Sequence, residues 1–254
     1  MQYSHSRIET FNKCQFQFKL RYLDNLETLP DDTADNALYL GTALHTGIQV
    51  GVDEAIKEYY SNYPIISDEI ITEAMKLEVM IQKARYVVPA NGKAEVELNT
   101  HDFKGFIDWL VPTEKQYHFD LYDFKYTNNE QNYMDSDQLH LYKYFFEKTH
   151  PGQYIRNMYF LFVPKSKLKR GKDEDLEQYR KRIMNEIVEI QPYLRHVEYR
   201  PEKVIEYMIS IKHCIETTEY CKNPQFLCKF CEYRRYCQSD GEEDWDIIYP
   251  NERR

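Results

Sequence analysis

Two residues in the middle of the chain form the clearest candidate for chemistry. Residues 116–125 (QYHFDLYDFK) are typical of a β-strand, in which side chains alternate between the two faces. Asp123 and Lys125 therefore share one face at the end of a mainly apolar row. A carboxylate beside an ammonium group can hold a metal ion next to a group that orients or deprotonates a water molecule. The alternative is a salt bridge at the margin of a sheet.

A second carboxylate lies in the preceding predicted strand. In residues 105–108 (GFID), Asp108 shares a face with Phe106 and can lie beside Asp123 if the two strands pair. Two carboxylates this close repel each other unless a cation or a proton lies between them, and Mg²⁺ prefers such oxygen ligands. Alternatively, Asp108 only ends the strand. Glu95 and Glu97 are equally available as solvent-facing residues or as an additional acid.

Two helical patterns contain further candidates. In GTALH, Gly41 and His45 share one helix face, and Gly41 would let another backbone approach. In QLHLY, Gln138 and Tyr142 lie one turn apart, which suits hydrogen bonding to a nucleic-acid backbone. A lone helical histidine is more often a packed or surface residue, and QLHLY is equally compatible with an amphipathic surface.

Three cysteines near the C-terminus have the spacing of a metal site: Cys228, Cys231 and Cys237. Cys14 is the distant fourth candidate. Four sulfur ligands suit either zinc or an iron–sulfur cluster, and spacing does not decide between them. Such a metal would join the two ends of the chain and stabilise the whole fold. We interpret Cys214 and Cys221 as buried or free thiols, with Cys221 as a reserve ligand.

The elements that must position these residues follow from periodicity. Helices are predicted over about 6–23, from about 37, and over 68–86 with Ser67 as N-cap, 136–148, 173–190 and 201–220. Strands are predicted over 94–99, 102–110, 116–125 and 154–163. The second helix contains a stripe of apolar residues at every fourth position: Leu40, Leu44, Ile48, Val52 and Ile56. This order predicts an α/β core in which helices cover a mixed sheet.

Composition limits the class of protein. The 254 residues are 42% apolar and 15% aromatic, which indicates a folded chain. The net charge of −9 disfavours a protein that coats nucleic acid by charge alone, although cations gather in 165–172 and acids in 240–246. The longest apolar runs fall far below the ~20 residues that span a bilayer, and no secretory pattern opens the chain. We expect a cytoplasmic protein whose cysteines are thiols or metal ligands.

Six segments together resemble one known family, the PD-(D/E)XK nucleases of the RecB type. They resemble in particular its iron–sulfur branch, which includes the nuclease domain of AddB and the CRISPR adaptation nucleases. The segments are SRIETFNKC, GTALH, GFID, DFK, QLHLY and CKFCEYRRYC, which occur in the family order and cover almost the whole chain. Two positions depart from the family pattern: Gln15 replaces the usual proline after the first cysteine, and Tyr126 replaces a common small hydroxyl residue.

The resemblance implies a role for each matching residue. His45, Asp108, Asp123 and the backbone carbonyl of Phe124 would bind one or two Mg²⁺ or Mn²⁺ ions, and Lys125 would position or activate the attacking water. Gln138 and Tyr142 would contact DNA near the scissile phosphate. A [4Fe-4S] cluster would be held by Cys14, Cys228, Cys231 and Cys237, which makes iron a better expectation than zinc. The implied fold is a restriction-endonuclease-like core whose N- and C-termini are joined by the four-cysteine site.

We therefore expect a single nuclease domain over 1–254, in which 1–30 and 201–240 form a cysteine-ligated subregion around a catalytic core at 37–200. The expected function is a metal-dependent DNase, an exonuclease that hydrolyses single-stranded or end-containing DNA in recombination, repair or replication, in a bacterial cell or a phage-infected host. No P-loop pattern occurs, so a helicase, recombinase or single-strand-binding protein would be a separate partner. The alternatives are a catalytically weak DNA-binding or assembly subunit of a recombination complex, and a zinc-stapled RNA-processing enzyme.

Overall fold

The chain divides into two units, and each is assembled from segments that are distant in the sequence. The computed structural model describes residues 2–250. One part, here called the sheet unit, contains Asp32–Asn99 and Gly105–Arg200. The other, here called the cysteine unit, contains the chain up to Asp31, Thr100–Lys104 and the chain from Pro201 onward. Within residues 2–250, no helix is long and apolar enough to cross a membrane.

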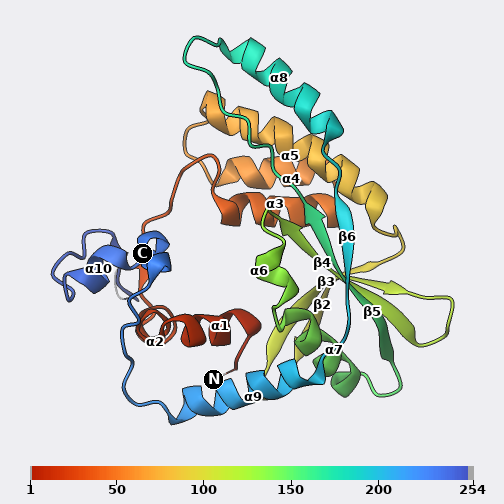
Figure 1. Cartoon of the computed structure of the whole chain (residues 1–254), viewed down its shortest axis with the longest axis vertical. Coiled ribbons are helices and arrows are strands. Elements are labelled where there is room, and N and C mark those ends of the chain that lie inside the picture. The colour runs from red at the N-terminus through yellow and green to blue at the C-terminus, as the bar shows by residue number, and fades with distance from the viewer. Residues whose placement is uncertain (1, 251–254) are drawn as a thin grey trace. The chain divides into compact units, whose positions relative to one another are not determined.

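A five-stranded sheet of order β2-β3-β4-β5-β6 forms the centre of the sheet unit (Figure 1). Its strands are β2 (Lys93–Asn99), β3 (Lys104–Pro112), β4 (His118–Tyr126), β5 (Tyr154–Val163) and β6 (Tyr193–Val197). β3 and β4 pair antiparallel, β4 and β5 parallel, and β5 and β6 antiparallel. A parallel pair needs a crossover, and α7 (Gln138–Thr149) provides it between β4 and β5. The predicted mixed sheet with flanking helices is confirmed.

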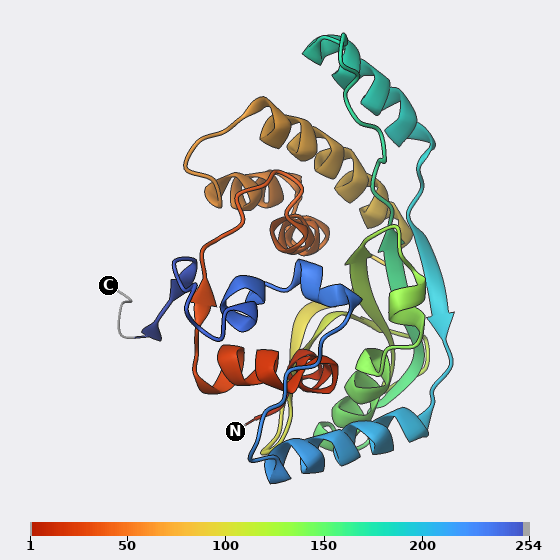
Figure 2. The ribbon, with the colours of Figure 1, turned by 60° about the vertical axis from the view of Figure 1, so that its left-hand side comes forward.

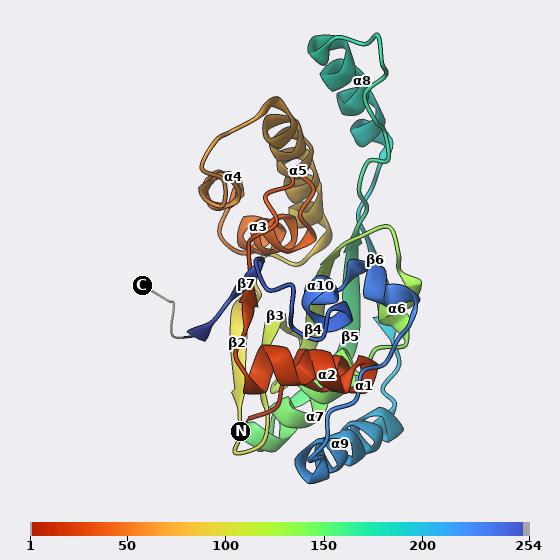
Figure 3. The ribbon, with the colours of Figure 1, turned by 90° about the vertical axis from the view of Figure 1, so that its left-hand side faces the viewer.

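Helices cover both faces of this sheet (Figure 3). One face packs against α3 (Ala37–Gln49), α4 (Val52–Ser61) and α5 (Asp68–Val87), whose apolar side chains form a common core with Tyr122 and Phe124 of β4. Lys125 is the next residue after Phe124, so its side chain lies on the opposite face, where it contacts α7. The sheet unit also contains α6 (Gln131–Met134) and α8 (Leu176–Glu189).

The helical part of the prediction is largely confirmed, although in the sheet unit the short helix α6 is additional and one predicted helix is divided in two. Ser67 caps α5 as predicted, because its hydroxyl accepts the backbone N–H of Ile70 at 3.4 Å. The apolar stripe that predicted one helix from Leu40 to Ile56 is shared between α3 and α4. The chain turns at Gly51, whose φ of +157° is rarely adopted by residues with a side chain, so the helix ends there.

The cysteine unit combines the two ends of the described chain (Figure 2). The expected helix over 6–23 is interrupted at Cys14, which has an extended backbone and separates α1 (His5–Lys13) from α2 (Gln15–Phe18) and the π-helical turn η1 (Lys19–Leu23). The rest of the unit comprises α9 (Pro201–Glu216), the 3₁₀ turn η2 (Phe226–Phe230), α10 (Arg234–Gln238) and the antiparallel pair β1 (Glu27–Thr28) and β7 (Ile247–Ile248). Phe11 packs edge-on against Phe18 and His213, which ties α1 to α2 and α9.

Candidate active site

The two predicted acidic residues meet where β3 and β4 pair. Trp109 lies opposite Tyr122 and Leu110 opposite Leu121. One further step in this antiparallel register brings Asp108 to Asp123. Asp108 and Asp123 are only 7% and 1% exposed, respectively. The sequence prediction that the two carboxylates lie side by side is therefore confirmed.

Burial and repulsion dominate the electrostatics of Asp108. Its Oδ2 atom accepts a hydrogen bond of 2.7 Å from the backbone N–H of Phe124. Burial first, and then the negative charge of Asp123, raise the pKa of Asp108 to about 7, although His45 and Lys125 act in the opposite direction. The site therefore favours a proton or a cation beside this carboxylate at neutral pH.

Asp123 and Lys125 form a buried ion pair on the same face of β4. The Nζ atom of Lys125 lies 2.6 Å from Oδ2 of Asp123. Burial alone would lower the pKa of Lys125, but the charges of Asp123 and Asp108 outweigh it and raise the pKa. Lys125 is therefore an ammonium donor at neutral pH. The other oxygen of Asp123, Oδ1, is buried and accepts no hydrogen bond from any described residue.

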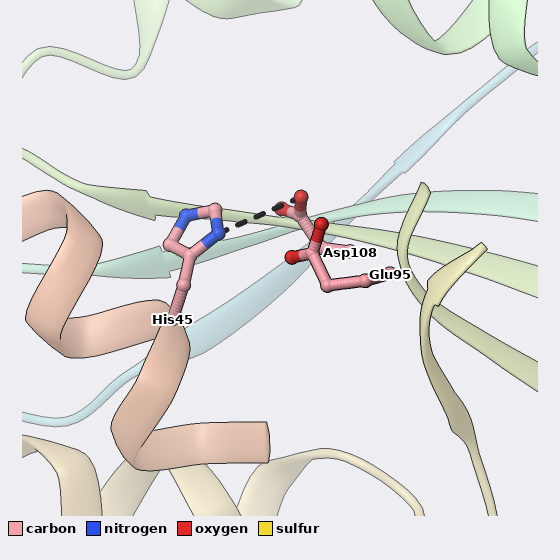
Figure 4. Close-up of side chains that lie close together, drawn as sticks. All are labelled: His45, Glu95 and Asp108. Atoms are coloured by element: carbon pink, nitrogen blue, oxygen red, sulfur yellow. Dashed lines mark ion pairs between the residues drawn. The ribbon is translucent and has the colours of Figure 1, made fainter. Parts of the chain in front are cut away.

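His45 and Glu95 complete a cluster of ligand-type atoms around Asp108 (Figure 4). The Nδ1 atom of His45, on α3, lies 3.5 Å from Oδ1 of Asp108. The Nε2 atom of His45 lies 3.0 Å from the carbonyl oxygen of Phe124. His45, Glu95 and Asp108 each offer one ligand atom, and these three atoms all lie within 4.8 Å of one another. The group has the composition and spacing of a site for a divalent cation.

The donor set fits Mg²⁺ or Mn²⁺ on two observations. Neighbouring ligands of an octahedral ion that are each ~2.1 Å from the metal lie roughly 3 Å apart. The ligand-type atoms of His45, Glu95 and Asp108 lie near this spacing, since Nδ1 of His45 is 3.5 Å from Oδ1 of Asp108 and all three atoms are within 4.8 Å of one another. The second observation is the buried Oδ1 atom of Asp123, because a bound cation would satisfy an oxygen that no donor reaches.

Gln49 supports this cluster from the same helix face as His45. Its side-chain amide donates to Oε1 of Glu95 at 2.8 Å and to the backbone carbonyl of Asp108 at 3.3 Å. Glu95 has a φ of +48°, which is uncommon for a residue with a side chain and typically costs about 1–3 kcal/mol. The strained backbone and the amide of Gln49 together hold the Glu95 carboxylate at the cluster.

Gln138 and Tyr142 lie on α7, where they extend the network from Lys125. The side-chain oxygen of Gln138 accepts a hydrogen bond of 3.0 Å from Lys125 Nζ, and its amide donates to the Tyr142 hydroxyl at 3.0 Å. Burial, followed by Asp123 and Asp108, raises the pKa of Tyr142. The Lys125 ammonium also lies 5.2 Å from the centre of the Tyr133 ring on α6. The Lys125 ammonium therefore contacts Asp123, Gln138 and the Tyr133 ring.

Two supporting residues were not identified from the sequence. Gln49 follows His45 by four residues, so the spacing rule that places two side chains on one helix face would have found it. Tyr133 belongs to the four-residue helix α6, which is too short to show a period. The sequence does not distinguish Glu95 from Glu97, and the structure places only Glu95 in the cluster.

The four cysteines of the predicted metal site lie in the cysteine unit, around one cavity of about 620 Å³. They are Cys14, Cys228, Cys231 and Cys237, and they form no disulfide. Sulfur ligands of one tetrahedral zinc ion lie roughly 3.8 Å apart. Among the described residues, no three cysteine sulfur atoms lie within 4.8 Å of one another. The structure therefore gathers the thiols around a shared space without closing a single-ion site.

The two remaining cysteines differ in their surroundings. Cys214 is buried on α9, and burial raises the pKa of its thiol to about 11, as expected for an inert packed cysteine. Cys221 is exposed, and its backbone amide and carbonyl bond to Gln15 and Phe16 next to Cys14. Gln15, one of the two departures from the family pattern, therefore helps to hold the backbone beside Cys14.

The chain is similar to one protein family in sequence and to solved structures in fold. The family model described as the PD-(D/E)XK nuclease superfamily matches residues 2–238. The crystal structure of a "Putative exonuclease" from Eubacterium rectale superposes with a TM-score of 0.52 and 11% identity, covering 92% of this chain and 87% of that one. The structure of SSO0001 covers 93% and 85% with a TM-score of 0.39 and 10% identity. No curated protein matches the chain in sequence.

The structural likeness at 11% identity concerns the fold alone. The family match extends over almost the whole chain and includes both strands that contain the acidic residues. The fold, the buried acidic pair with its lysine, and this match agree. The chain belongs to the PD-(D/E)XK nuclease superfamily.

Proposed function

We propose that the protein is a divalent-metal-dependent DNA exonuclease that hydrolyses phosphodiester bonds of single-stranded or end-containing DNA. The observation that supports it best is the buried arrangement of Asp108, Asp123 and Lys125. Two carboxylates lie side by side, Oδ1 of Asp123 lacks a donor among the described residues, and the charged Lys125 lies 2.6 Å from Oδ2 of Asp123. A purely structural ion pair would not leave a buried acceptor without a partner.

We further propose that His45, Asp108, Asp123, Glu95 and the Phe124 carbonyl hold Mg²⁺ or Mn²⁺. A bound divalent ion would supply Lewis-acid chemistry, because it lowers the pKa of water and offsets the negative charge that develops on a phosphodiester under attack. Gln49 holds Glu95 and fixes its carboxylate before the ion binds. The cation would compete with a proton for Asp108, because burial and the charge of Asp123 raise the pKa of this carboxyl to about 7.

Lys125 would orient the attacking water and donate a hydrogen bond toward the phosphate. Its charge persists because the two carboxylates raise its pKa, so it acts as a donor. Gln138 would aim this ammonium, since its side-chain oxygen accepts from Nζ while its amide is held by Tyr142. Gln138 and Tyr142 would also contact DNA near the scissile phosphate, in line with the family resemblance.

For the cysteine unit we propose a [4Fe-4S] cluster held by Cys14, Cys228, Cys231 and Cys237. The four thiols line one cavity, and their sulfur atoms are more widely spread than a single zinc ion requires. A cubane cluster places its ligands further apart than one ion does. Lys13, Lys222 and Arg234 also line this cavity, and no acidic residue does, which suits the negative charge of four thiolates with their cluster.

The cellular role is a proposal that rests on the exonuclease activity. Recombination, repair and replication all generate DNA ends, and a separate helicase, recombinase or single-strand-binding protein would supply or protect the strand. The alternative, a weakly catalytic DNA-binding or assembly subunit, is less compatible with a lysine held by Asp123, Gln138 and Tyr133 in one position.

Digestion of end-labelled linear and closed circular DNA tests this proposal. Anaerobically purified protein is incubated with each substrate and with Mg²⁺, Mn²⁺ or EDTA. We expect metal-dependent loss of linear DNA only, and the labelled end that is released first reports the polarity. Lys125→Ala should retain only a small residual activity, whereas Lys115→Ala, which changes an exposed lysine in the turn between β3 and β4, should behave as wild type. Equal cutting of the circle would contradict the exonuclease role.

A further inference from the structure

Two exposed phenylalanines and a lysine stand together on η2, outside the candidate active site. Phe226 and Phe230 are 74% and 73% exposed, which is unusual for side chains of this size. Their ring centres lie 6.4 Å apart, with an angle of 76° between the ring planes. The Lys229 ammonium lies 3.6 Å from the Phe226 ring centre and 4.7 Å from that of Phe230. The three side chains are here called the η2 platform.

The platform is firmly attached to the end of α1. The amide side chains of Asn223 and Gln225 both donate to the backbone carbonyl of Lys13, at 2.9 and 3.0 Å. The turn itself is closed by backbone hydrogen bonds from Cys228 to Gln225 and from Cys231 to Cys228. Because these hydrogen bonds fix the backbone of the turn, less conformational entropy is lost when a ligand orders the rings.

The charges around the platform favour an anionic ligand. Lys229, Arg234 and Arg235 form no ion pair with a carboxylate anywhere in residues 2–250. The one acidic residue in the segment 225–235 is Glu232, and it is bound to Arg21. A protein partner that docks through an apolar surface alone would leave these three cations unpaired.

We propose that the η2 platform binds single-stranded DNA by stacking unpaired bases on Phe226 and Phe230, while Lys229 contacts the phosphate backbone. Proteins that bind single strands without sequence preference combine exposed aromatic rings with cations. Every base has a π-face that can stack on a ring, and every nucleotide carries a phosphate that can contact a cation. Paired bases have no free face inside a duplex, so the platform discriminates against duplex DNA. This inference rests on the proposed function, in which DNA is the substrate.

Fluorescence anisotropy on the full chain tests the platform. The protein is titrated in EDTA, which prevents cleavage, against a labelled oligothymidylate, an abasic oligomer of equal length and a blunt hairpin duplex. Phe226→Ala and Phe230→Ala should each weaken oligothymidylate binding by about 5- to 100-fold and leave binding to the abasic oligomer and the duplex unchanged. Phe226→Trp should restore the affinity. Lys229→Ala should weaken both single strands and reduce the salt slope by about 0.7.

Leu227→Ala is the matched control, since this residue is in the same turn and 50% exposed but has no ring to stack. It should bind as wild type. The proposal is overturned if the phenylalanine variants bind oligothymidylate with wild-type affinity. It is also overturned if their affinities for oligothymidylate and for the abasic oligomer fall equally, because the contact would then not involve the bases. An equal or larger loss of oligothymidylate binding with Leu227→Ala would also overturn it, because the effect would then not depend on stacking rings.

The outcomes separate this inference from the proposed function. If the wild type cleaves no DNA in any metal but shows the base-dependent affinity, the nuclease proposal fails and the platform stands. If the wild type digests linear DNA while the phenylalanine variants bind normally, the reverse holds. Equal thermal unfolding of all variants confirms that the turn is folded in each.

Discussion

The backbone amide of Phe124 donates a 2.7 Å hydrogen bond to the buried carboxylate of Asp108. This bond joins β3 to β4 between the two residues of β4 that are proposed to act in catalysis. The carbonyl of the same residue faces His45 at 3.0 Å. One peptide unit therefore connects the histidine of α3 with the acid of β3, so loss of the acceptor at Asp108 would affect both the proposed metal site and the strand pairing.

In EDTA, the wild type should lose stability as the pH rises, and Asp108→Asn should remove this pH dependence. The folded-state pKa of Asp108 is about 7, above its ordinary value of 3.8, so the folded state binds a proton that the unfolded state has released. Stability therefore falls as the pH rises from about 4 to about 7. Over this pH range, the free energy of unfolding of the wild type should fall by about 1 kcal/mol per pH unit relative to that of the variant.

Chemical unfolding of both proteins at several pH values measures this difference. Asparagine keeps an acceptor for the Phe124 amide, so the strand pairing survives in the variant. Addition of Mn²⁺ should stabilise the wild type at pH 7 and leave the variant unchanged. Parallel pH profiles of the two proteins in EDTA would show that Asp108 is not the titrating group.

Gln138→Ala should lower the cleavage rate without changing metal affinity. The substitution removes the acceptor at 3.0 Å from Lys125 Nζ, so the ammonium loses one of its three contacts. We expect a 10- to 100-fold lower kcat, typical of a positioning residue next to a catalytic group. In a double-mutant cycle with Lys125→Ala, the second substitution should add little. Fully additive effects would mean that Gln138 acts on DNA and not through Lys125.

Gln49→Ala should weaken metal binding through Glu95. Without the 2.8 Å hydrogen bond, the exposed Glu95 carboxylate is free to leave the cluster. Loss of such an outer partner typically costs 10- to 100-fold in metal affinity. Titration of Mn²⁺ by isothermal calorimetry measures it, with Gln178→Ala on the exposed face of α8 as control. Unchanged affinity in Gln49→Ala would remove Glu95 from the ligand set, and Glu97→Gln should have no effect in either case.

Cys231→Ser should remove iron and destabilise the protein, if the four thiols hold a cluster. Cys231 lines the same cavity as Cys14, so its loss would break the connection between the two ends of the chain. Iron content and the visible absorption of anaerobically purified protein measure the loading. Cys221→Ser is the matched control and should keep full iron content. An equal loss of iron in Cys231→Ser and Cys221→Ser would contradict this ligand set.

Most of the sheet unit could be predicted from the sequence, because its long elements have clear periods. The strand containing Asp123 and the N-cap at Ser67 follow from local patterns, and the structure has both. β6 could not be predicted from the sequence, because this edge strand has only five residues. The helix end at Gly51 was also missed, since the apolar stripe continues across the turn and masks it.

The connections within the site could be predicted only in part. The strand register follows from adjacency in sequence, so Asp108 beside Asp123 was predictable. The contact between Lys125 and Gln138 depends on how the crossover helix α7 lies over β4, and no local pattern encodes that placement. The positive φ of Glu95 is likewise imposed by its surroundings, since glutamate has no preference for it.

The most direct test of the central claim is metal-dependent hydrolysis of linear DNA by the wild type and by Asp123→Asn. The substitution removes the buried negative charge and keeps the shape, so the fold should persist. Asp120→Asn is the matched control, because Asp120 lies three residues earlier in β4 and pairs with Arg156 away from the site. We predict release of nucleotides by the wild type and Asp120→Asn with Mg²⁺ or Mn²⁺, and none by Asp123→Asn. Hydrolysis by a folded Asp123→Asn at the wild-type rate would contradict the account.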